Sequence, residues 1–325
     1  MDHYTEESED RLFEMLQDMM DNPGYLRGIS TGFDTIDRAT RGMQPEQLIT
    51  LVGIPKAGKS SIALAIARAA RRMAKNTVFF TFEMTVEEQQ YRLLSMDTGM
   101  SLTNLLTGKF NPAKLKAMRR DMKVLRDGSS LMFMTDTSAT TTLDAVAARI
   151  LQMSPDLVII DGAYLLDPDD SKVIPMSPQH LTKMTRGAKR MAQRLRLPIV
   201  ITTQALIARS KKGLDMGSVG YSSSFAQDSD VLLGVESVLE DSPKGAISKV
   251  KVLASRSGPK GEAFVRVDWS SGTIEEIDKI EAGRATGGRH DSTHEGWGEG
   301  DYGDDEPRHR RDPGGSRRRR RVDPS

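Results

Sequence analysis

The sequence of 325 residues contains no cysteine, which excludes a disulfide framework, a cysteine-based zinc site and a thiol nucleophile. Long hydrophobic runs are also missing: no apolar stretch approaches the roughly 18 residues that span a bilayer, and residues 1–10 are too acidic for a signal peptide. The formal net charge is only +1, so bulk charge indicates no class of partner. We therefore expect a soluble, cytoplasmic protein that binds no membrane.

One segment is suited to holding phosphate. Residues 53–60 read G-x-x-x-x-G-K-S and lie between the apolar run 47–52 and a helical pattern. The glycines let backbone N–H groups and the positive end of the helix face a phosphate chain, with Lys59 at the β and γ phosphates and the Ser60 hydroxyl on Mg²⁺. The alternative is a structural glycine turn. The predicted nucleotide-binding residues are Gly53, Ile54, Pro55, Lys56, Ala57, Gly58, Lys59, Ser60 and Ser61.

Three regions differ in composition. Residues 1–27 are acidic and contain a helical pattern over 9–21, whose apolar face would lie on its own domain or on a neighbouring subunit. Residues 28–280 alternate strands with helical patterns, which predicts an α/β domain with a mainly parallel sheet. Residues 281–325, acidic and then arginine-rich, predict a disordered tail. The arginines 317–321 would contact phosphates, would neutralise the acidic stretch upstream, or would simply be solvated.

Eight strands are predicted within residues 28–280. Those after residue 230 lack intervening helices, so we expect them to extend the sheet in antiparallel fashion. The predicted strands are 47–52, 77–82, 131–134, 157–160, 199–203, 231–235, 249–253 and 263–268.

Polar residues end three of these strands. Asp161 follows four apolar residues and is expected beside the Mg²⁺ that Ser60 binds. Glu83 would orient and polarise the attacking water. Gln204 would respond to the γ phosphate. Helix capping is the alternative for Glu83 and Asp161.

Basic residues follow Gln204 and the strand 249–253. Arg209, Lys211 and Lys212, before the glycine-rich stretch 213–220, are predicted to grip nucleic-acid phosphates, with an exposed loop as the alternative. Arg256 precedes the turn 257–261 and would project from a sheet end. It is either a surface arginine or an arginine finger for a neighbour's active site.

In this order, the segments resemble the RecA-like motor domain of the DnaB family of replicative hexameric helicases. The resemblance covers residues 26–277. The segments that carry it are 28–37, the phosphate loop 53–60, the glutamate motif 81–84, the metal-acid motif 160–165, the sensor 203–204, the segment 226–231 and the finger motif 255–261.

This resemblance implies a RecA-like P-loop NTPase that hydrolyses ATP with Mg²⁺ between the subunits of a homo-hexamer, translocates on single-stranded DNA and unwinds it in DNA replication. Glu83, Lys59, Gln204 and Arg256 would be catalytic, with Arg256 acting in trans. A replication loader or primase is an implied partner. The chain resembles a phage-type form without the N-terminal domain, which would act in the host cytoplasm and weakens the expectation of primase docking.

The finger motif departs from the family pattern. Ala254 stands where the family has a lysine, and strand alternation predicts that Lys251 faces the other way. Slower hydrolysis is therefore expected. Two other functions share the phosphate loop: a RecA-like recombination or repair ATPase, and a regulatory RecA-like assembly ATPase.

Overall fold

The computed structural model describes residues 6–21, 26–128, 130–135, 141–169, 172–204, 206–207, 219–220, 227–240, 245–256 and 258–286. The chain divides into two units, Met1–Gly288 and Arg289–Ser325, and every described residue belongs to the first. The predicted tail lies outside the described residues from 287 onward. None of the helices in the described ranges has the length and apolar character needed to cross a membrane.

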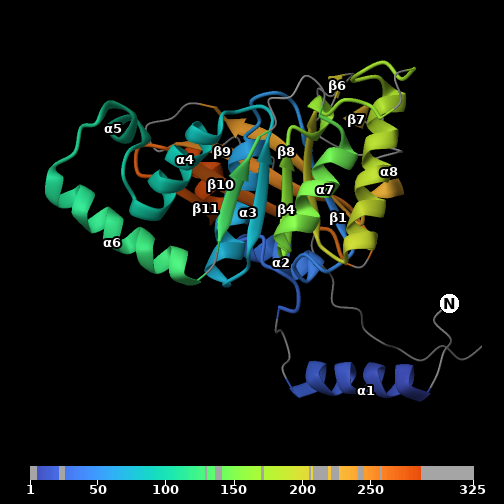
Figure 1. Cartoon of the computed structure of the whole chain (residues 1–325). Helices are drawn as coiled ribbons and strands as arrows, with labels where there is room; N and C mark the ends of the chain where they lie inside the picture. The colour runs from blue at the N-terminus through green and yellow to red at the C-terminus, as the bar shows by residue number, and fades with distance from the viewer. Residues whose placement is uncertain are drawn as a thin grey trace, which may run out of the picture. The chain divides into compact units, whose positions relative to one another are not determined.

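A nine-stranded mixed sheet forms the centre of the first unit, in the order β11-β10-β9-β8-β1-β5-β4-β2-β3 (Figure 1). The pairings from β8 through β1, β5, β4 and β2 to β3 are parallel, and those among β8, β9, β10 and β11 are antiparallel. The predicted α/β fold with a mainly parallel sheet and an antiparallel extension is thus confirmed. The strands are β1 (Leu48–Gly53), β2 (Thr77–Thr81), β3 (Leu131–Met134), β4 (Leu157–Asp161), β5 (Ile199–Gln204), β8 (Val231–Leu239), β9 (Ala246–Ser255), β10 (Glu262–Asp268) and β11 (Thr273–Ile277).

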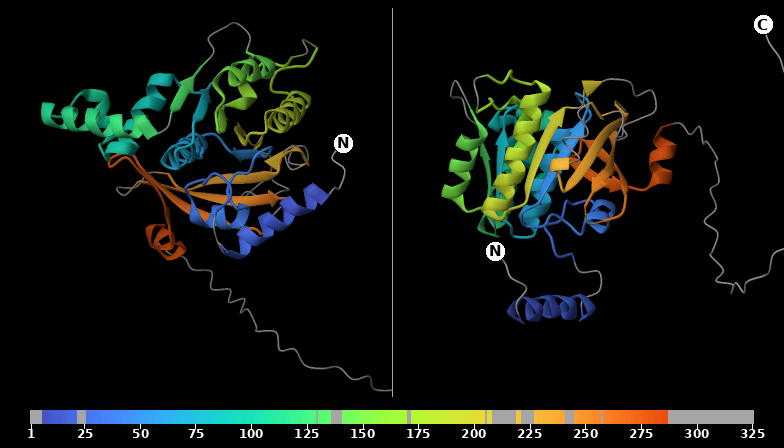
Figure 2. Two further views of the ribbon diagram at one scale, coloured as in Figure 1. Left: turned by 60° about the horizontal axis from the view of Figure 1, so that its bottom comes forward. Right: turned by 90° about the vertical axis from the view of Figure 1, so that its right-hand side faces the viewer.

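Helices cover both faces of this sheet (Figure 2). One hydrophobic cluster joins α2, α3 and α4 to the sheet, and a second joins α7 and α8 to its other face. Every residue of β1, β2 and β4 is buried, as expected for strands covered on both sides. The helices are α1 (Glu6–Asp21), α2 (Asp34–Thr40), α3 (Lys59–Arg72), α4 (Val86–Thr98), α5 (Leu102–Thr107), α6 (Pro112–Gly128), α7 (Leu143–Met153), the 3-10 turn η1 (Ala163–Leu165), α8 (Pro178–Leu195) and α10 (Lys279–Ala285).

The segment 28–37, which resembles a family motif, has a structural role. The Asp37 carboxylate accepts hydrogen bonds from the Thr31 backbone at 2.8 Å, the Thr31 hydroxyl at 2.7 Å and the Ser30 hydroxyl at 2.5 Å. These bonds fix the turn that leads into α2, because Asp37 is itself buried. The motif therefore shapes the fold near the sheet and contributes no atom to the site described below.

Both ends of the described chain extend beyond the sequence predictions. Helix α1 begins three residues before the predicted 9–21, and Leu12, Met15 and Leu16 are exposed. At the other end, α10 passes the predicted boundary at residue 280. Its Ala282 is buried in one cluster with Ile247 and Ile277, so packed structure continues into α10.

Candidate active site

The phosphate loop connects β1 to the first residue of α3. Gly58 precedes α3 with φ 94°, a left-handed conformation that favours glycine, and no side chain caps the helix. The first N–H groups of α3 therefore lack the side-chain partner that a capped helix has, which is the arrangement that binds anions. The Ser248 hydroxyl on β9 donates to the Ala57 carbonyl at 3.0 Å and ties the loop to the sheet. Pro55 and Lys56 are exposed, and Ser61 is buried on α3.

Lys59 points back into this loop. Its ammonium group donates to the Ile54 carbonyl at 3.0 Å, and the side chain is buried. Burial lowers the pKa of Lys59, while the charges of Glu83 and Asp161 oppose that change. A phosphate anion in the loop would compensate the desolvated charge, because an opposite charge nearby favours the ionised amine.

Ser60 meets the two predicted carboxylates. Its hydroxyl donates to Asp161 Oδ1 at 3.1 Å and lies 3.4 Å from Glu83 Oε2. The parallel register aligns the ends of β2 and β4, with Thr81 opposite Asp161. Glu83 follows two residues later and is exposed. The fold thus brings Ser60, Glu83 and Asp161 to one edge of the sheet.

Asp161 is fully buried and held by residues that the sequence analysis did not identify. The Thr202 hydroxyl donates to Oδ1 at 2.8 Å, and Gln89 Nε2 donates to Oδ2 at 3.4 Å. Burial raises the pKa of Asp161 to about 6, against the hydrogen bonds from Thr202 and Ser60 and the charge of Lys59, which lower it. Thr202 is a polar residue in the apolar strand β5, which was the available signal, whereas Gln89 lies in a polar part of α4 that offered none.

The donor set fits Mg²⁺. A hydroxyl and a carboxylate oxygen 3.1 Å apart are hard oxygen ligands, and Mg²⁺ typically takes one or two carboxylates and completes its shell with water and substrate phosphates. Among the described residues, no group of three or more His, Cys, Asp or Glu side chains is arranged so that it could hold a metal ion, so the described part of the chain offers no all-protein cage.

The capping alternatives do not describe Glu83 or Asp161. Thr85 caps α4, in a reciprocal arrangement with Glu88. The residue before η1 is Gly162, and no side chain caps that turn. Both carboxylates are therefore left for the contacts described above.

Gln204 ends β5 at the same edge, opposite Gly53. Its amide donates to the Tyr164 hydroxyl at 2.5 Å, and that hydroxyl donates to Glu83. Tyr164 belongs to the metal-acid motif 160–165, but the sequence predicted no role for it. Its position three residues after a strand-ending acid was the available signal.

Arg256 lies at the opposite edge of the sheet. Because β9 is antiparallel to β8, Ser255 pairs with Val231, which pairs with Ile49 near the start of β1. The phosphate loop begins at Gly53, the far end of β1, roughly 13 Å from Ile49 along the strand. An arginine side chain is far shorter than that distance, so Arg256 does not reach the phosphate loop of its own chain.

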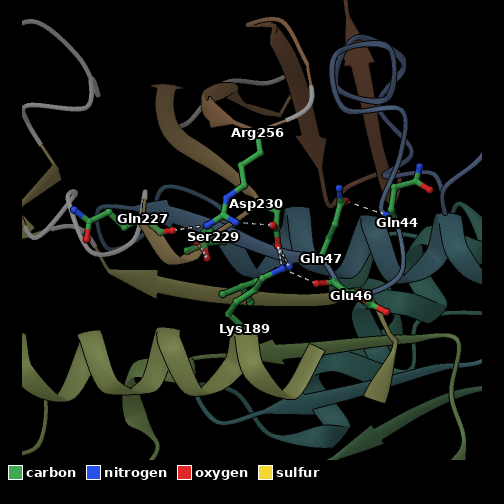
Figure 3. A network of polar contacts seen from close by, with 10 residues as sticks. Gln44, Glu46, Gln47, Lys189, Gln227, Ser229, Asp230 and Arg256 are labelled. Carbon is green, nitrogen blue, oxygen red and sulfur yellow. Dashed lines mark hydrogen bonds and ion pairs between the residues drawn. The ribbon is translucent and has the colours of Figure 1, made fainter. Parts of the chain in front are cut away.

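A polar network holds Arg256 in place (Figure 3). The Arg256 guanidinium donates to the Gln227 carbonyl at 2.6 Å and lies 3.6 Å from Asp230 Oδ1. The other carboxylate oxygen of Asp230 accepts from Lys189 and from the Leu48 backbone, both at 2.7 Å. Asp230 thus connects the first strand, α8 and the candidate finger.

A β-bulge changes the faces predicted around Ala254. Leu232 pairs with Ala254 and Leu233 with Val252, so Leu253 is an extra residue in β9. Val250 and Val252 belong to the hydrophobic cluster on one face of the sheet, whereas Leu253 and Ala254 pack in the cluster on the other face. Lys251, between two residues of the first cluster, therefore shares its face with Ala254. The prediction of opposite faces was wrong because it assumed regular alternation.

The predicted DNA-binding residues Arg209, Lys211 and Lys212 lie outside the described residues. Two short strands flank that part of the chain, β6 (Leu206–Ile207) and β7 (Val219–Gly220), which pair with each other. Neither this two-stranded ribbon nor β11 was among the predicted strands.

The sequence is similar to those of known proteins. Residues 28–275 match the family model described as the DnaB-like helicase C terminal domain. The replicative DNA helicase DnaB of Geobacillus stearothermophilus is 25% identical over 265 residues, which are 78% of this chain and 58% of that protein. The DnaB of Leifsonia xyli subsp. xyli is 29% identical over 247 residues, 73% of this chain and 53% of that protein. The chain thus spans just over half the length of these curated relatives.

Solved structures agree on the fold. One solved structure, described as an ATPase domain, superposes with a TM-score of 0.74 at 18% identity, over 85% of this chain and all of that one. A DnaB-like replicative helicase, described with its interactions with primase, superposes with a TM-score of 0.71 at 18% identity, over 82% of this chain and 68% of that one. The family model matches most of the sequence, and the solved structures have the same fold. The chain therefore belongs to the family of DnaB-like helicase C-terminal domains.

Proposed function

We propose that this chain is the ATP-driven motor of a DNA helicase that acts in replication as a homo-hexameric ring. One observation carries the proposal: Ser60, Glu83 and Asp161 gather at one edge of the sheet, while the register puts Arg256 at the other. The site at one edge therefore gains an arginine finger only when a second copy of the chain supplies its Arg256.

Each residue then has a chemical role. Lys59 and the N-terminus of α3 bind the β and γ phosphates of ATP. Ser60 and Asp161 hold Mg²⁺, which when bound neutralises charge on the phosphates. Glu83 orients the attacking water, which reaches it because its side chain is exposed. Gln204 responds to the γ phosphate.

The remaining parts of the motor concern partners. Arg256 of one subunit stabilises the transition state in the next. The exposed apolar side of α1, with Leu12, Met15 and Leu16, packs on a neighbouring subunit. Arg209, Lys211 and Lys212 grip single-stranded DNA. A replication loader or a primase delivers or uses the ring, in line with the primase interactions described for one similar helicase.

Unwinding of a forked DNA duplex, measured together with ATP turnover, tests this function. The wild-type protein is expected to do both in the presence of Mg²⁺, and Lys59→Ala to do neither, because the Lys59 ammonium is the buried positive charge of the loop. Lys75→Ala is the matched control, since Lys75 is a half-exposed lysine that pairs with Asp156 away from the loop. Unwinding that survives Lys59→Ala, or filaments on DNA without rings, contradicts the proposal.

A further inference from the structure

Tyr164 occupies a position that none of the predicted roles explains. It lies in η1, the turn that follows β4, and the residue is 5% exposed within the second hydrophobic cluster. The turn contacts β5 and α8. Packing therefore fixes the ring and determines where its hydroxyl lies.

That hydroxyl joins two residues of the proposed site. Gln204 Nε2 donates to it at 2.5 Å, and it donates to Glu83 Oε1. A hydroxyl has a single hydrogen, so the bond to the carboxylate leaves it as an acceptor toward Gln204. An unbroken chain of hydrogen bonds thus runs from the amide at the end of β5 to the carboxylate after β2.

Gly162 makes this geometry possible. Its φ of 86° lies in the left-handed region, and a Cβ at this position would come 3.0 Å from Glu83 Cγ. Its N–H donates to the Thr202 hydroxyl at 2.7 Å. The turn is thereby fixed on β5, with space left for the Glu83 side chain beside it.

We infer that Tyr164 is a positioning residue that carries the state of Gln204 to Glu83. The inference rests on the proposed function. Hydrogen bonds in a chain polarise one another, so the hold of Tyr164 on Glu83 changes once the Gln204 amide turns to the γ phosphate. Gln204 also lies two residues before β6, which pairs with β7, and in the sequence the predicted DNA contacts come between these two strands. Tyr164 thus links Gln204, the sensor, to Glu83, the residue that orients water.

The substitution Tyr164→Phe tests this step, because it removes the hydroxyl and keeps the buried ring. The kcat for ATP is expected to fall about tenfold, the effect of one hydrogen bond to a charged group. The KM for ATP should stay unchanged, since neither hydrogen bond of the hydroxyl involves the loop 53–60. The control is Tyr91→Phe, which removes a hydroxyl next to the separate cluster of Met100, Leu105 and Met118 and should leave kcat and the melting temperature as in the wild type.

A double-substitution cycle separates transmission from mere packing. If Tyr164 and Gln204 act through one chain of bonds, Tyr164→Phe combined with Gln204→Leu is no slower than the slower single variant. The inference is overturned if the reductions in kcat from the two substitutions multiply in the double variant, or if Tyr164→Phe has the kcat of the wild type. Either result leaves the proposed function intact as long as Lys59→Ala abolishes ATP turnover. A wild type without ATP turnover would instead remove the proposed function, and this inference with it.

Discussion

The hydroxyl of Ser60 lies 3.1 Å from a carboxylate oxygen of Asp161, although 101 residues separate the two in the chain. The contact exists because β1 and β4 both lie beside β5 in the parallel part of the sheet and end at the same edge. The helix that follows β1 begins with Lys59 and Ser60, so the phosphate loop and the metal acid face each other.

Replacing Asp161 by asparagine should stabilise the protein when it is stripped of Mg²⁺ and nucleotide. The folded pKa of about 6 lies above the ordinary value of 3.8, so the folded state binds the proton more tightly. Protonated Asp161 therefore contributes stability that is complete below pH 3.8 and is lost as the pH rises through 6. The corresponding change in the free energy of unfolding is about 3 kcal/mol. Denaturation of both proteins between pH 4 and 8 measures it. Equal pH dependence in the two would contradict the burial argument.

Two adjacent threonines on β5 should respond oppositely to valine. Thr202 and Thr203 are both fully buried. The Thr202 hydroxyl accepts from the Gly162 N–H and donates to Asp161, whereas the Thr203 hydroxyl has no hydrogen-bond partner among the described residues. Thr202→Val should lower the free energy of unfolding by about 1–3 kcal/mol, and Thr203→Val should be neutral or stabilising. Urea denaturation of the matched pair decides, and equal losses would refute the distinction.

Subunits with complementary defects should restore each other. Arg256→Ala and Lys59→Ala proteins are each expected to be inactive. In a mixed ring, a Lys59→Ala subunit donates its intact Arg256 to a neighbour whose phosphate loop is intact. ATP turnover should therefore reappear on mixing and vary with the ratio of the two proteins. Absence of recovery, in a mixture shown to exchange subunits, would exclude action of Arg256 in trans.

Asp230 should matter far more to stability than Asp228, two residues earlier. The Asp230 carboxylate is the acceptor for a buried backbone N–H and for Lys189. Asp228 faces Arg186 at 3.5 Å, and that arginine is half exposed. Asp230→Ala should cost about 3–5 kcal/mol, because it leaves Lys189 without its charge partner, and Asp228→Ala less than about 1 kcal/mol. Thermal and urea unfolding provide the measurement, and similar losses would argue against Asp230 as the centre of the network.

The local pattern of apolar residues was enough to predict most strands of the sheet. It failed where a strand lacks a continuous apolar run or where the alternation of faces is interrupted. The eight predicted strands are apolar runs between helical patterns, and all eight exist. Strand β11 was missed because its sequence, with Glu275 and Glu276, lacks a continuous apolar run. The faces of β9 were wrong because one extra residue, Leu253, interrupts the alternation. A bulge depends on pairing with another strand and leaves no mark in a single segment.

The candidate site divides in the same way. Strand-ending Glu83, Asp161 and Gln204 could be predicted, since each polar residue closes an apolar run. Gln89 and Thr202 could not, because their role comes from the approach of α4 and β5 to Asp161.

By itself, the sequence determined the phosphate loop, the order of the motifs and the alternation of strands and helices, because each is encoded in neighbouring residues. Only the tertiary structure decided that Ser60 meets Asp161, that Tyr164 joins Gln204 to Glu83, and that Arg256 lies across the sheet from its own phosphate loop. Those relationships arise from strand order and direction. Which strands become neighbours is settled by burial across the whole sheet, and no short segment records it.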